Sequence, residues 1–517
     1  MVTRPKDADA IVARLLPLVV STSGSSADVI SPLDGNQVCQ IPISSNDDVT
    51  HAFETARGAF ENWRETKLSN RLRCINKFHD LLLNNTDEIL DIVQWENGKT
   101  RASGNDEILD IALTCQYYVS NARKLLKPKR RQGAFPIVTV VREHNQPLGV
   151  VGVISPWNYP LTLAVSDFIP ALLAGNTVVI KPDLQTPLSA LVLIDLLYQS
   201  GIPRDAIQVV MGEGAEVGPQ IVEHADFVMF TGSTRVGKEV AKQAAARLIP
   251  SSMELGGKNS LIIDKNIDVQ SAVEIAVRGA FANSGQLCIG TERIIVHTDV
   301  YKDFMPLFIT AVSRMKLGSE IGWGFDMGTL INERQIQTAE TQIADAVSKG
   351  AKVEVGGKRR IDLGPFVFEP TVLTNVNPDA TICGTETFGP VCSVYTWSSE
   401  AELVSFVNNT DYGLSAGIVS KNISWANKIA LRLKVGAVNI NEAFASAYVS
   451  IDAPMGGMKQ SGVGRRHGSG GILKYTESQT IARQRWMKLG PQWKMNDEGW
   501  AKFAKVAVKI LNKRTFE

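Results

Sequence analysis

The sequence predicts an α/β fold built from two parallel-sheet units with a cleft between them. Short runs of β-branched residues alternate with helix-compatible segments, and most of these runs are apolar throughout, which is typical of strands buried on both faces of a sheet. The runs form two successive series, at 149–265 and 291–441. The chain has 517 residues, more than one core of ordinary domain size holds, so we expect two or more domains.

The composition excludes several classes of function. Hydrophobic residues make up 44% of the chain, charged residues 21%, and the net charge is +1, so no overall field would attract nucleic acid. The six cysteines and six histidines are scattered, without a CxxC pair or zinc-ligand spacing. We therefore expect no metal site, no nucleic-acid partner, free thiols and a cytoplasmic location.

The N-terminal part is predicted to be helical. An interrupted apolar run at 11–20 predicts a packed helix rather than a signal peptide or a membrane span. Residues 44–63 predict a second helix, in which Ser45 and Asp48 form a capping box. Helical patterning then continues to about residue 127.

The expected strands follow a basic cluster at 127–132, which we interpret as a solvated linker rather than a nucleic-acid surface because the whole chain is nearly neutral. The first series of strands is expected at 149–155, 176–182, 207–212, 226–233 and 259–265. The second is expected at 291–297, 392–397, 415–420 and 436–441.

Two glycine-rich turns lead from expected strands into expected helices. They are "MGEGAEVG" at 211–218, which includes Gly214, and "FTGSTRVG" at 230–237, which includes Gly232. A helix N-terminus after such a turn offers free N–H groups to a phosphate. Neither turn has the GxGxxG spacing, so a simple tight connection remains the alternative.

Three polar residues are candidates for chemistry. Cys288, in "FANSGQLCIG" (281–290), has no histidine nearby and is a structural thiol, half of a disulfide, a metal ligand or a nucleophile. Asn158 follows a strand end, where open α/β sheets bind ligands, and its carboxamide either stabilises an oxyanion or caps a turn. Glu254, before a Gly-Gly pair, is either a base with a raised pKa or a surface residue.

Taken together, six segments resemble the signature segments of the aldehyde dehydrogenase family in order and spacing. They are "PWNYP", "FTGSTRVG", "ELGGKN", "GQLC", "ETFGP" and "PMGGMKQSG". Within the family, the sequence is most similar to the NADP-dependent succinate-semialdehyde dehydrogenases of the actinobacterial type. The resemblance implies the aldehyde dehydrogenase fold: a Rossmann-like cofactor domain, an α/β catalytic domain and a small β oligomerisation arm.

The resemblance also implies a mechanism. Cys288 attacks the aldehyde to give a thiohemiacetal, a hydride leaves to the nicotinamide, and water hydrolyses the resulting thioester. Glu254 would be the base, and Asn158 with the Cys288 N–H would form the oxyanion hole. The cofactor-binding residues implied are Trp157, Lys181, Asp183, Leu184, Gly214, Gly232, Ser233, Glu386 and Phe388. A thiol hydrolase, a non-catalytic member and an acyl-CoA-forming member are the alternatives that these residues disfavour.

The chain departs from the family at two places. NAD-preferring members have glutamate three residues after the lysine that corresponds to Lys181, where this chain has Leu184, so we expect NADP to be preferred and NAD to be a weaker alternative. Most relatives also have a lysine and a glutamate where this chain has Asp167 and Arg466. Because both signs are reversed, we infer that Asp167 and Arg466 pair.

The substrate is expected to be a small aldehyde, with succinate semialdehyde favoured. Well-known enzymes for that substrate carry two arginines where this chain has Ser166 and Ala282. An apolar or aromatic aldehyde such as benzaldehyde is therefore the alternative. The expected pocket residues are Tyr159, Leu163, Asp167, Ala282, Leu287, Phe444, Tyr448 and Arg466.

The resemblance also suggests a division of the chain. We expect a dinucleotide-binding domain at 1–127 and 149–255, a catalytic domain at 256–471, an oligomerisation arm at 128–148 and 472–490, and an amphipathic tail at 491–517. A homodimer, or a tetramer of two dimers, is expected. The tail could lie on an anionic membrane, but docking on its own or a neighbouring subunit is favoured.

Overall fold

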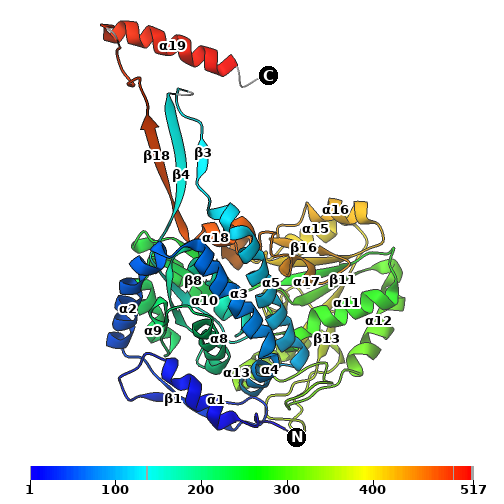
Figure 1. The fold of residues 1–517 in the computed structure, drawn as a ribbon. Helices are drawn as coiled ribbons and strands as arrows, with labels where there is room; N and C mark the ends of the chain where they lie inside the picture. The colour runs from blue at the N-terminus through cyan, green and yellow to red at the C-terminus, as the bar shows by residue number, and fades with distance from the viewer. Residues whose placement is uncertain (1, 136–137, 493, 514–517) are drawn as a thin grey trace.

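The computed structural model describes residues 2–135, 138–492 and 494–513 (Figure 1). Its first large sheet has six strands in the order β17-β9-β8-β5-β6-β7. The strands are β5 (Val150–Ile154), β6 (Thr177–Lys181), β7 (Ile207–Val209), β8 (Phe227–Thr231), β9 (Ser251–Glu254) and β17 (Gly462–Val463). Four of the five strand pairs are parallel, and the pair of β17 with β9 is antiparallel. Strands β5 and β6 are fully buried, as their apolar sequences predict.

Helices cover both faces of this sheet. On one face, α2 (Asn46–Glu65), α9 (Gly214–His224) and α10 (Thr234–Ala246) contact the strands. On the other face lie α3 (Leu68–Asn84), α4 (Thr86–Asn97), α5 (Arg101–Leu126), α6 (Thr162–Val165), α7 (Ile169–Ala174), α8 (Pro187–Gln199) and α18 (Gly468–Leu473). The predicted capping box at the start of α2 is confirmed, since Ser45 and Asp48 bond each other's backbone N–H.

The second large sheet has seven strands in the order β12-β13-β14-β11-β10-β15-β16. They are β10 (Asn259–Ile263), β11 (Thr291–His297), β12 (Lys352–Val355), β13 (Thr371–Thr374), β14 (Val391–Trp397), β15 (Ser415–Val419) and β16 (Ala437–Ile440). Its helices are α11 (Val269–Phe281), α12 (Thr298–Ser313), α13 (Glu333–Ser348), α14 (Thr381–Gly384), α15 (Glu400–Asn408), α16 (Ile423–Ala430) and α17 (Ala445–Tyr448). Every strand of the two predicted series is present, but the segment at 259–265, expected in the first series, forms β10 of the second sheet because it pairs with β11 and β15.

A three-stranded antiparallel arm projects from the body (Figure 1). It is formed by β3 (Lys129–Arg131), β4 (Thr139–Pro147) and β18 (Thr476–Gln484). The basic cluster expected to be a linker therefore contains a strand instead: β3 pairs with β4, and all three of its residues are exposed. Helix α19 (Asp497–Lys513) lies beyond the arm, and Trp500 contacts Phe135 with ring centroids 6.3 Å apart. Parts of the expected arm and tail, at 136–137, 493 and 514–517, fall outside the described residues.

The remaining elements complete the body. They are α1 (Ala8–Leu15), β1 (Ser26–Ile30), β2 (Gln37–Pro42) and the short 3-10 turns η1 (Leu16–Leu18), η2 (Arg204–Ala206), η3 (Ala282–Gly285) and η4 (Lys459–Ser461). The predicted N-terminal helix at 11–20 corresponds to α1 and η1. Among the described residues, no helix combines the length and the apolar character that crossing a membrane requires. All six cysteines are free.

Candidate active site

Cys288 lies in a tightly supported loop between η3 and β11. Its backbone carbonyl accepts a hydrogen bond from Asn259 Nδ2 at 2.7 Å. Gly257 passes so close that a Cβ there would lie 2.6 Å from the same carbonyl. Three consecutive positive φ angles, of 51°, 56° and 71° at residues 283–285, turn the chain out of α11 toward the thiol. The thiol is therefore placed by backbone contacts, and its side chain is only half-buried.

Glu254 ends β9 and is 5% exposed. Its Oε1 has no hydrogen-bond partner among the described residues. Burial raises its pKa to about 7, while the cations Arg466 and Lys474 lower it and Asp167 raises it. Burial also raises the pKa of Cys288 to about 12, with Glu386 and Glu254 adding to the effect. The thiol is thus protonated at neutral pH, and Glu254 is a base poised in that range.

The Asn158 loop is clamped by a buried ion pair that the sequence analysis missed. Lys99 Nζ bonds Glu107 Oε1 at 2.5 Å and the Asn158 carbonyl at 2.8 Å, and both charged side chains are fully buried. Glu107 in turn accepts from the Leu161 and Thr162 N–H groups. The Asn158 carboxamide donates to Gln286 O at 3.1 Å, beside the Cys288 loop. This pair therefore orients the carboxamide predicted to stabilise an oxyanion.

A groove of about 370 Å³ reaches Cys288 from one side. Of the predicted cofactor residues, it is lined by Trp157, Gly232, Ser233, Glu386 and Phe388. The Trp157 and Phe388 rings meet edge to face at 5.5 Å. The groove is also lined by Asn158 and Glu254, and by two arginines, Arg235 and Arg334, that the sequence analysis did not single out.

The loop that carries Glu386 is held by hydrogen bonds to the buried Glu292. Glu292, at 7% exposure, accepts hydrogen bonds from the Thr387 and Phe388 N–H groups at 2.9–3.0 Å and pairs with Lys258. Glu386 Oε1 accepts from the Gly257 N–H at 2.8 Å, and a Cβ on Gly256 would lie 2.3 Å from its Oε2. Burial raises the pKa of Glu386 to about 8.

Four predicted cofactor residues lie away from this groove, around the carboxyl end of β6. Lys181 is buried, and its Nζ donates to Pro182 O at 3.0 Å. Asp183 accepts from the Gln185 N–H at 3.0 Å, and Leu184 packs against the core while remaining partly exposed. Gly214 is the first residue of α9. These residues lie near the carboxyl ends of β6 and β7, whereas Gly232 and Ser233 follow the carboxyl end of β8 in the same sheet.

A second cavity of about 200 Å³, which we call the tunnel, also reaches Cys288. The predicted residues that line it are Tyr159, Leu163, Leu287, Phe444, Tyr448 and Arg466. Asp167 and Ala282, also predicted as pocket residues, are not among its lining residues. The Asp167 side chain is turned into the core to meet Arg466, and Ala282 borders a neighbouring surface groove.

The predicted pair of Asp167 and Arg466 is confirmed. Arg466 Nε donates to Asp167 Oδ1 at 3.2 Å, and Nη2 pairs with Oδ2. The side chains are 3% and 6% exposed, respectively. Tyr475 Oη also donates to the Asp167 carbonyl at 2.5 Å. The neighbouring Lys474, half-buried with its Nζ 3.4 Å from Met229 Sδ, is a further cation facing this cluster that the sequence analysis missed.

Arg278, on α11, is another missed residue that lines the tunnel. Its guanidinium lies 5.8 Å from the centroid of the Phe444 ring. Arg278 lies four residues, or about one helical turn, before Ala282, the position at which the sequence analysis looked for an arginine. This spacing is the signal that could have revealed it. Four acidic residues line the same tunnel: Asp106, Glu107, Asp110 and Glu254.

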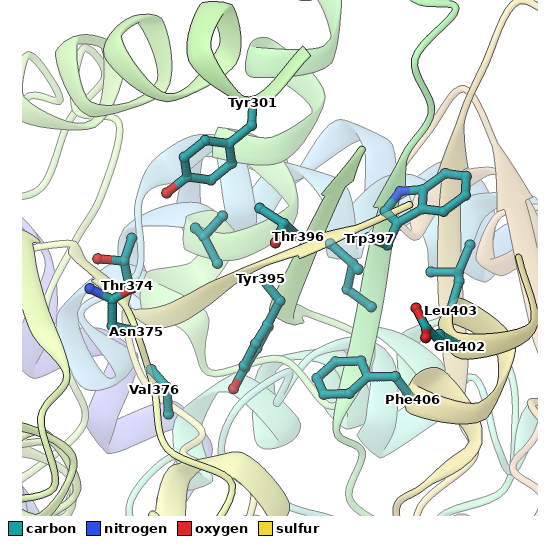
Figure 2. A pocket seen from close by; sticks show the side chains of 12 residues that line it. Tyr301, Thr374, Asn375, Val376, Tyr395, Thr396, Trp397, Glu402, Leu403 and Phe406 are labelled. Carbon is teal, nitrogen blue, oxygen red and sulfur yellow. The ribbon is translucent and has the colours of Figure 1, made fainter. Parts of the chain in front are cut away.

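A separate cavity of about 370 Å³ lies among β11, β13 and β14 (Figure 2). Tyr301, Tyr395 and Phe406 border it, and it shares no lining residue with the two cavities that reach Cys288. Within residues 2–135, 138–492 and 494–513, no three His, Cys, Asp or Glu side chains gather in a way that would hold a metal ion.

Comparison with known proteins identifies the family. The pattern of the family described as the aldehyde dehydrogenase family matches residues 19–481. The chain belongs to the aldehyde dehydrogenase family. The resemblance inferred from the six motifs is thereby confirmed, as is the expectation of an NAD(P)-dependent aldehyde dehydrogenase at the level of the family.

Individual relatives agree with this membership. A Mycolicibacterium smegmatis protein, by name a candidate NADP-dependent succinate-semialdehyde dehydrogenase, is 44% identical over 514 residues, or 98% of this chain and 99% of that protein. The crystal structure of succinate-semialdehyde dehydrogenase from Burkholderia pseudomallei matches with a TM-score of 0.86 and 33% identity over 90% of this chain and 96% of that one. An NAD complex of aldehyde dehydrogenase from Bacillus cereus matches with a TM-score of 0.86 and 31% identity over 92% and 98%. The predicted fold class is therefore confirmed.

Proposed function

We propose that the protein oxidises an aldehyde to its carboxylic acid with NADP, and that the aldehyde is succinate semialdehyde. The observation that carries this proposal is the position of Cys288 on the wall shared by the groove and the tunnel. A dinucleotide and an aldehyde can then approach the thiol from opposite sides. The printed names of the mycobacterial relative and the Burkholderia structure support the choice of aldehyde.

The groove fits a dinucleotide. A side chain on Gly256 would collide with Glu386, so the glycine leaves the groove open beside that carboxylate. Glu386 Oε1 is held by the Gly257 N–H, and Oε2 accepts no hydrogen bond among the described residues, which suits a ribose hydroxyl. Ser233 begins α10, whose N-terminus favours a phosphate. When bound there, NADP supplies the hydride acceptor.

The first step is assigned to Cys288, Glu254 and Asn158. Glu254 takes the thiol proton as the sulfur forms a bond to the aldehyde carbon, because the thiol, with a pKa of about 12, does not ionise alone at neutral pH. The carbonyl electrons move to oxygen. The Asn158 Nδ2 and the Cys288 N–H then donate hydrogen bonds to that oxyanion, and its collapse expels the hydride and leaves a thioester.

The second step uses the same base again. Glu254 first releases the thiol proton to solvent. It then takes a proton from water as the water oxygen attacks the thioester carbon, the carbon–sulfur bond breaks, and the Cys288 sulfur recovers a proton from Glu254. Because an intact carboxylate in this position activates water, hydrolysis is favoured over transfer to CoA. The overall reaction converts an aldehyde, water and NADP to a carboxylate, NADPH and protons.

The NADP preference rests on Leu184. The side chain is partly exposed after β6 and carries no charge that would repel a 2′-phosphate. A carboxylate at that position would accept bonds from the ribose hydroxyls of NAD. One unit charge about 4 Å from a phosphate is worth about 4 kcal/mol at an effective dielectric constant near 20, enough to decide between the two cofactors. NAD remains a weaker alternative.

The carboxylate of succinate semialdehyde is assigned to Arg278. Arg466 is unsuited to this role, because its charge is already met by Asp167. The Arg278 guanidinium has no carboxylate within ion-pair distance among the described residues, and it lines the tunnel from the Phe444 side. Asp110, on the opposite wall, has its charge partly met by the hydroxyls of Thr162 and Tyr448.

The assembly, location and domain division complete the proposal. The arm presents β3 and β18 as edge strands away from the body, which supports a homodimer, or a tetramer of dimers. The six free cysteines support a cytoplasmic location. The two large sheets support separate dinucleotide-binding and catalytic domains, although β17, from within 256–471, joins the first sheet. The C-terminal helix is assigned to contact with a subunit rather than with a membrane.

The test is a matrix of initial rates at 340 nm. Succinate semialdehyde, butanal and benzaldehyde are each measured with NADP and with NAD. We expect the highest kcat/KM for succinate semialdehyde with NADP, because butanal has the same length without the charge. A preference for benzaldehyde or butanal would show that the aromatic wall and the tunnel carboxylates set specificity instead. Higher activity with NAD would contradict the argument from Leu184.

A further inference from the structure

The groove beside Cys288 carries two arginines that the mechanism above does not use. Arg235 lies in the first turn of α10, and Arg334 lies in the first turn of α13. Both line the cavity that Trp157 and Ser233 also line. Both are exposed. Neither guanidinium makes a hydrogen bond or ion pair with any residue that the structure describes. Two uncompensated cations therefore face one groove.

The arginines come from helices that pack on different sheets. Helix α10 packs on β8 and β9 of the six-stranded sheet, whereas α13 belongs to the unit built on the seven-stranded sheet. A ligand that meets both guanidinium groups would thus bridge the two units. The N-termini of α10 and α13 carry the positive ends of their helix dipoles at the same two places.

The backbone beneath each arginine is held firmly. At α10, the Ser233 side chain caps the helix and Lys238 Nζ bonds Gln460 Oε1 at 2.8 Å. At α13, Asn332 Oδ1 accepts from the Gln335 N–H at 3.1 Å, and Gln335 Nε2 bonds the Phe388 carbonyl at 3.0 Å. Each guanidinium therefore extends from a fixed point into the groove.

The acidic side chains near the two arginines already have partners or assigned roles. Glu333, next to Arg334, is paired with Arg359 through contacts of 2.6 and 2.9 Å. The carboxylates that line the groove, Glu254 and Glu386, lie near Cys288, where the base and the ribose contact are assigned. The two arginines are left to meet an anion supplied by the ligand.

We propose that Arg235 and Arg334 clamp the diphosphate of the dinucleotide from the two walls of the groove. The inference rests on the proposed function, because it takes a dinucleotide as the ligand. A guanidinium presents two parallel N–H donors to phosphate oxygens, and a diphosphate offers oxygens to both walls. Lys181 and Leu184, which are assigned to the adenosine end, do not line this cavity. The clamp therefore acts on the part that NADP and NAD share.

The test measures cofactor binding directly. The dissociation constants of NADPH and NADH are determined by nucleotide fluorescence for the full-length protein, R235M, R334M and the double variant, at low and at high salt. We expect each single variant to bind about tenfold more weakly, as the loss of a charge-assisted hydrogen bond implies. The factor should be the same for both nucleotides, and the double variant should lose most of the salt dependence.

K242M is the matched control, since it removes the same charge from α10 at an exposed side chain that does not line the groove. Circular dichroism checks that each variant is folded. If R235M and R334M bind both nucleotides like the wild type, the clamp is wrong. If only NADPH binding weakens, the arginines contact the 2′-phosphate and the diphosphate assignment is wrong. If the wild type binds neither nucleotide, it is the proposed function that fails.

Discussion

Removing Arg466 alone should destabilise the protein strongly, whereas removing Arg466 and Asp167 together should not. The two side chains form a two-point contact, with Nε and Oδ1 3.2 Å apart, and are 6% and 3% exposed, so solvent screens them little. At about 4 Å and an effective dielectric constant near 20, the attraction is about 4 kcal/mol. A buried charge left alone costs about 3–5 kcal/mol, while an apolar replacement of both partners is often neutral.

The assay is a double-mutant cycle with R466M, D167L and the combined variant. The free energy of unfolding is measured in urea at pH 7, together with the rate of unfolding. We expect each single variant to lose about 3–5 kcal/mol. The combined variant should recover most of this loss, so the coupling energy, which is the sum of the two single losses minus the loss of the combined variant, should be at least about 4 kcal/mol. Additive losses would refute the reasoning, because they would show that the two charges do not depend on each other.

The pH dependence provides a second check on the same pair. Burial alone would raise the pKa of Asp167, but Arg466 outweighs it and lowers the pKa below its usual value. A carboxylate whose pKa is lower in the folded protein stabilises the fold at pH values above its pKa in the unfolded chain, which is near 4. This stabilisation disappears as the pH falls through the pKa of the folded state. The coupling should therefore be constant from pH 5 to pH 8. A coupling that faded near pH 7 would implicate Glu254, whose pKa is about 7, instead of Asp167.

Four further predictions concern activity. Because Glu254 has a pKa of about 7 and must be ionised to act as a base, kcat should rise as the pH increases through 7, and E254Q should lose at least about a hundredfold in kcat. Lys474 lowers the pKa of Glu254, so K474M should move this rise in kcat to higher pH, whereas K474R should not. A rise that stays in place in K474M would show that Lys474 does not act on the base. L184E should favour NAD by about tenfold or more, whereas the uncharged L184Q should keep the NADP preference, and equal behaviour of the two would exclude charge as the cause. R278Q should raise the KM for succinate semialdehyde about tenfold and leave that for butanal unchanged, with R278K intermediate; an equal effect on both aldehydes would remove Arg278 from carboxylate recognition. N158A should lower kcat by about a hundredfold or more with little change in NADPH binding, and a kcat near the wild-type value would argue against its oxyanion role.

Local patterns in the sequence predicted most of the architecture. Runs such as "VVGVI" and "TVVIK" became central buried strands because a continuous apolar segment has no solvent-facing side. The capping box at Ser45 formed because it needs only residues within one turn. The basic segment at 127–132 was misjudged because its exposed strand is held by pairing with β4, not by its own composition.

The motifs also predicted the chemical groups of the site, since Cys288, Glu254 and Asn158 all line the cavities that meet at the thiol. Reversal of sign at two distant positions was enough to predict that Asp167 and Arg466 pair. That inference succeeded because a buried charge must find an opposite charge, wherever in the chain it lies.

Only the tertiary structure decided which charges remain available. Arg466 pairs with a residue 299 positions away in the chain, so it is unsuited to hold a substrate carboxylate. Arg278, in contrast, lines the tunnel and forms no ion pair within the part of the chain that the structure describes. The two arginines that line the groove likewise come from separate helices, α10 and α13. Lys99, which supports the Asn158 carbonyl, lies 59 positions before it in the chain. A charge's role depends on its neighbours in space, and in a fold of crossing strands those neighbours lie far apart in the chain.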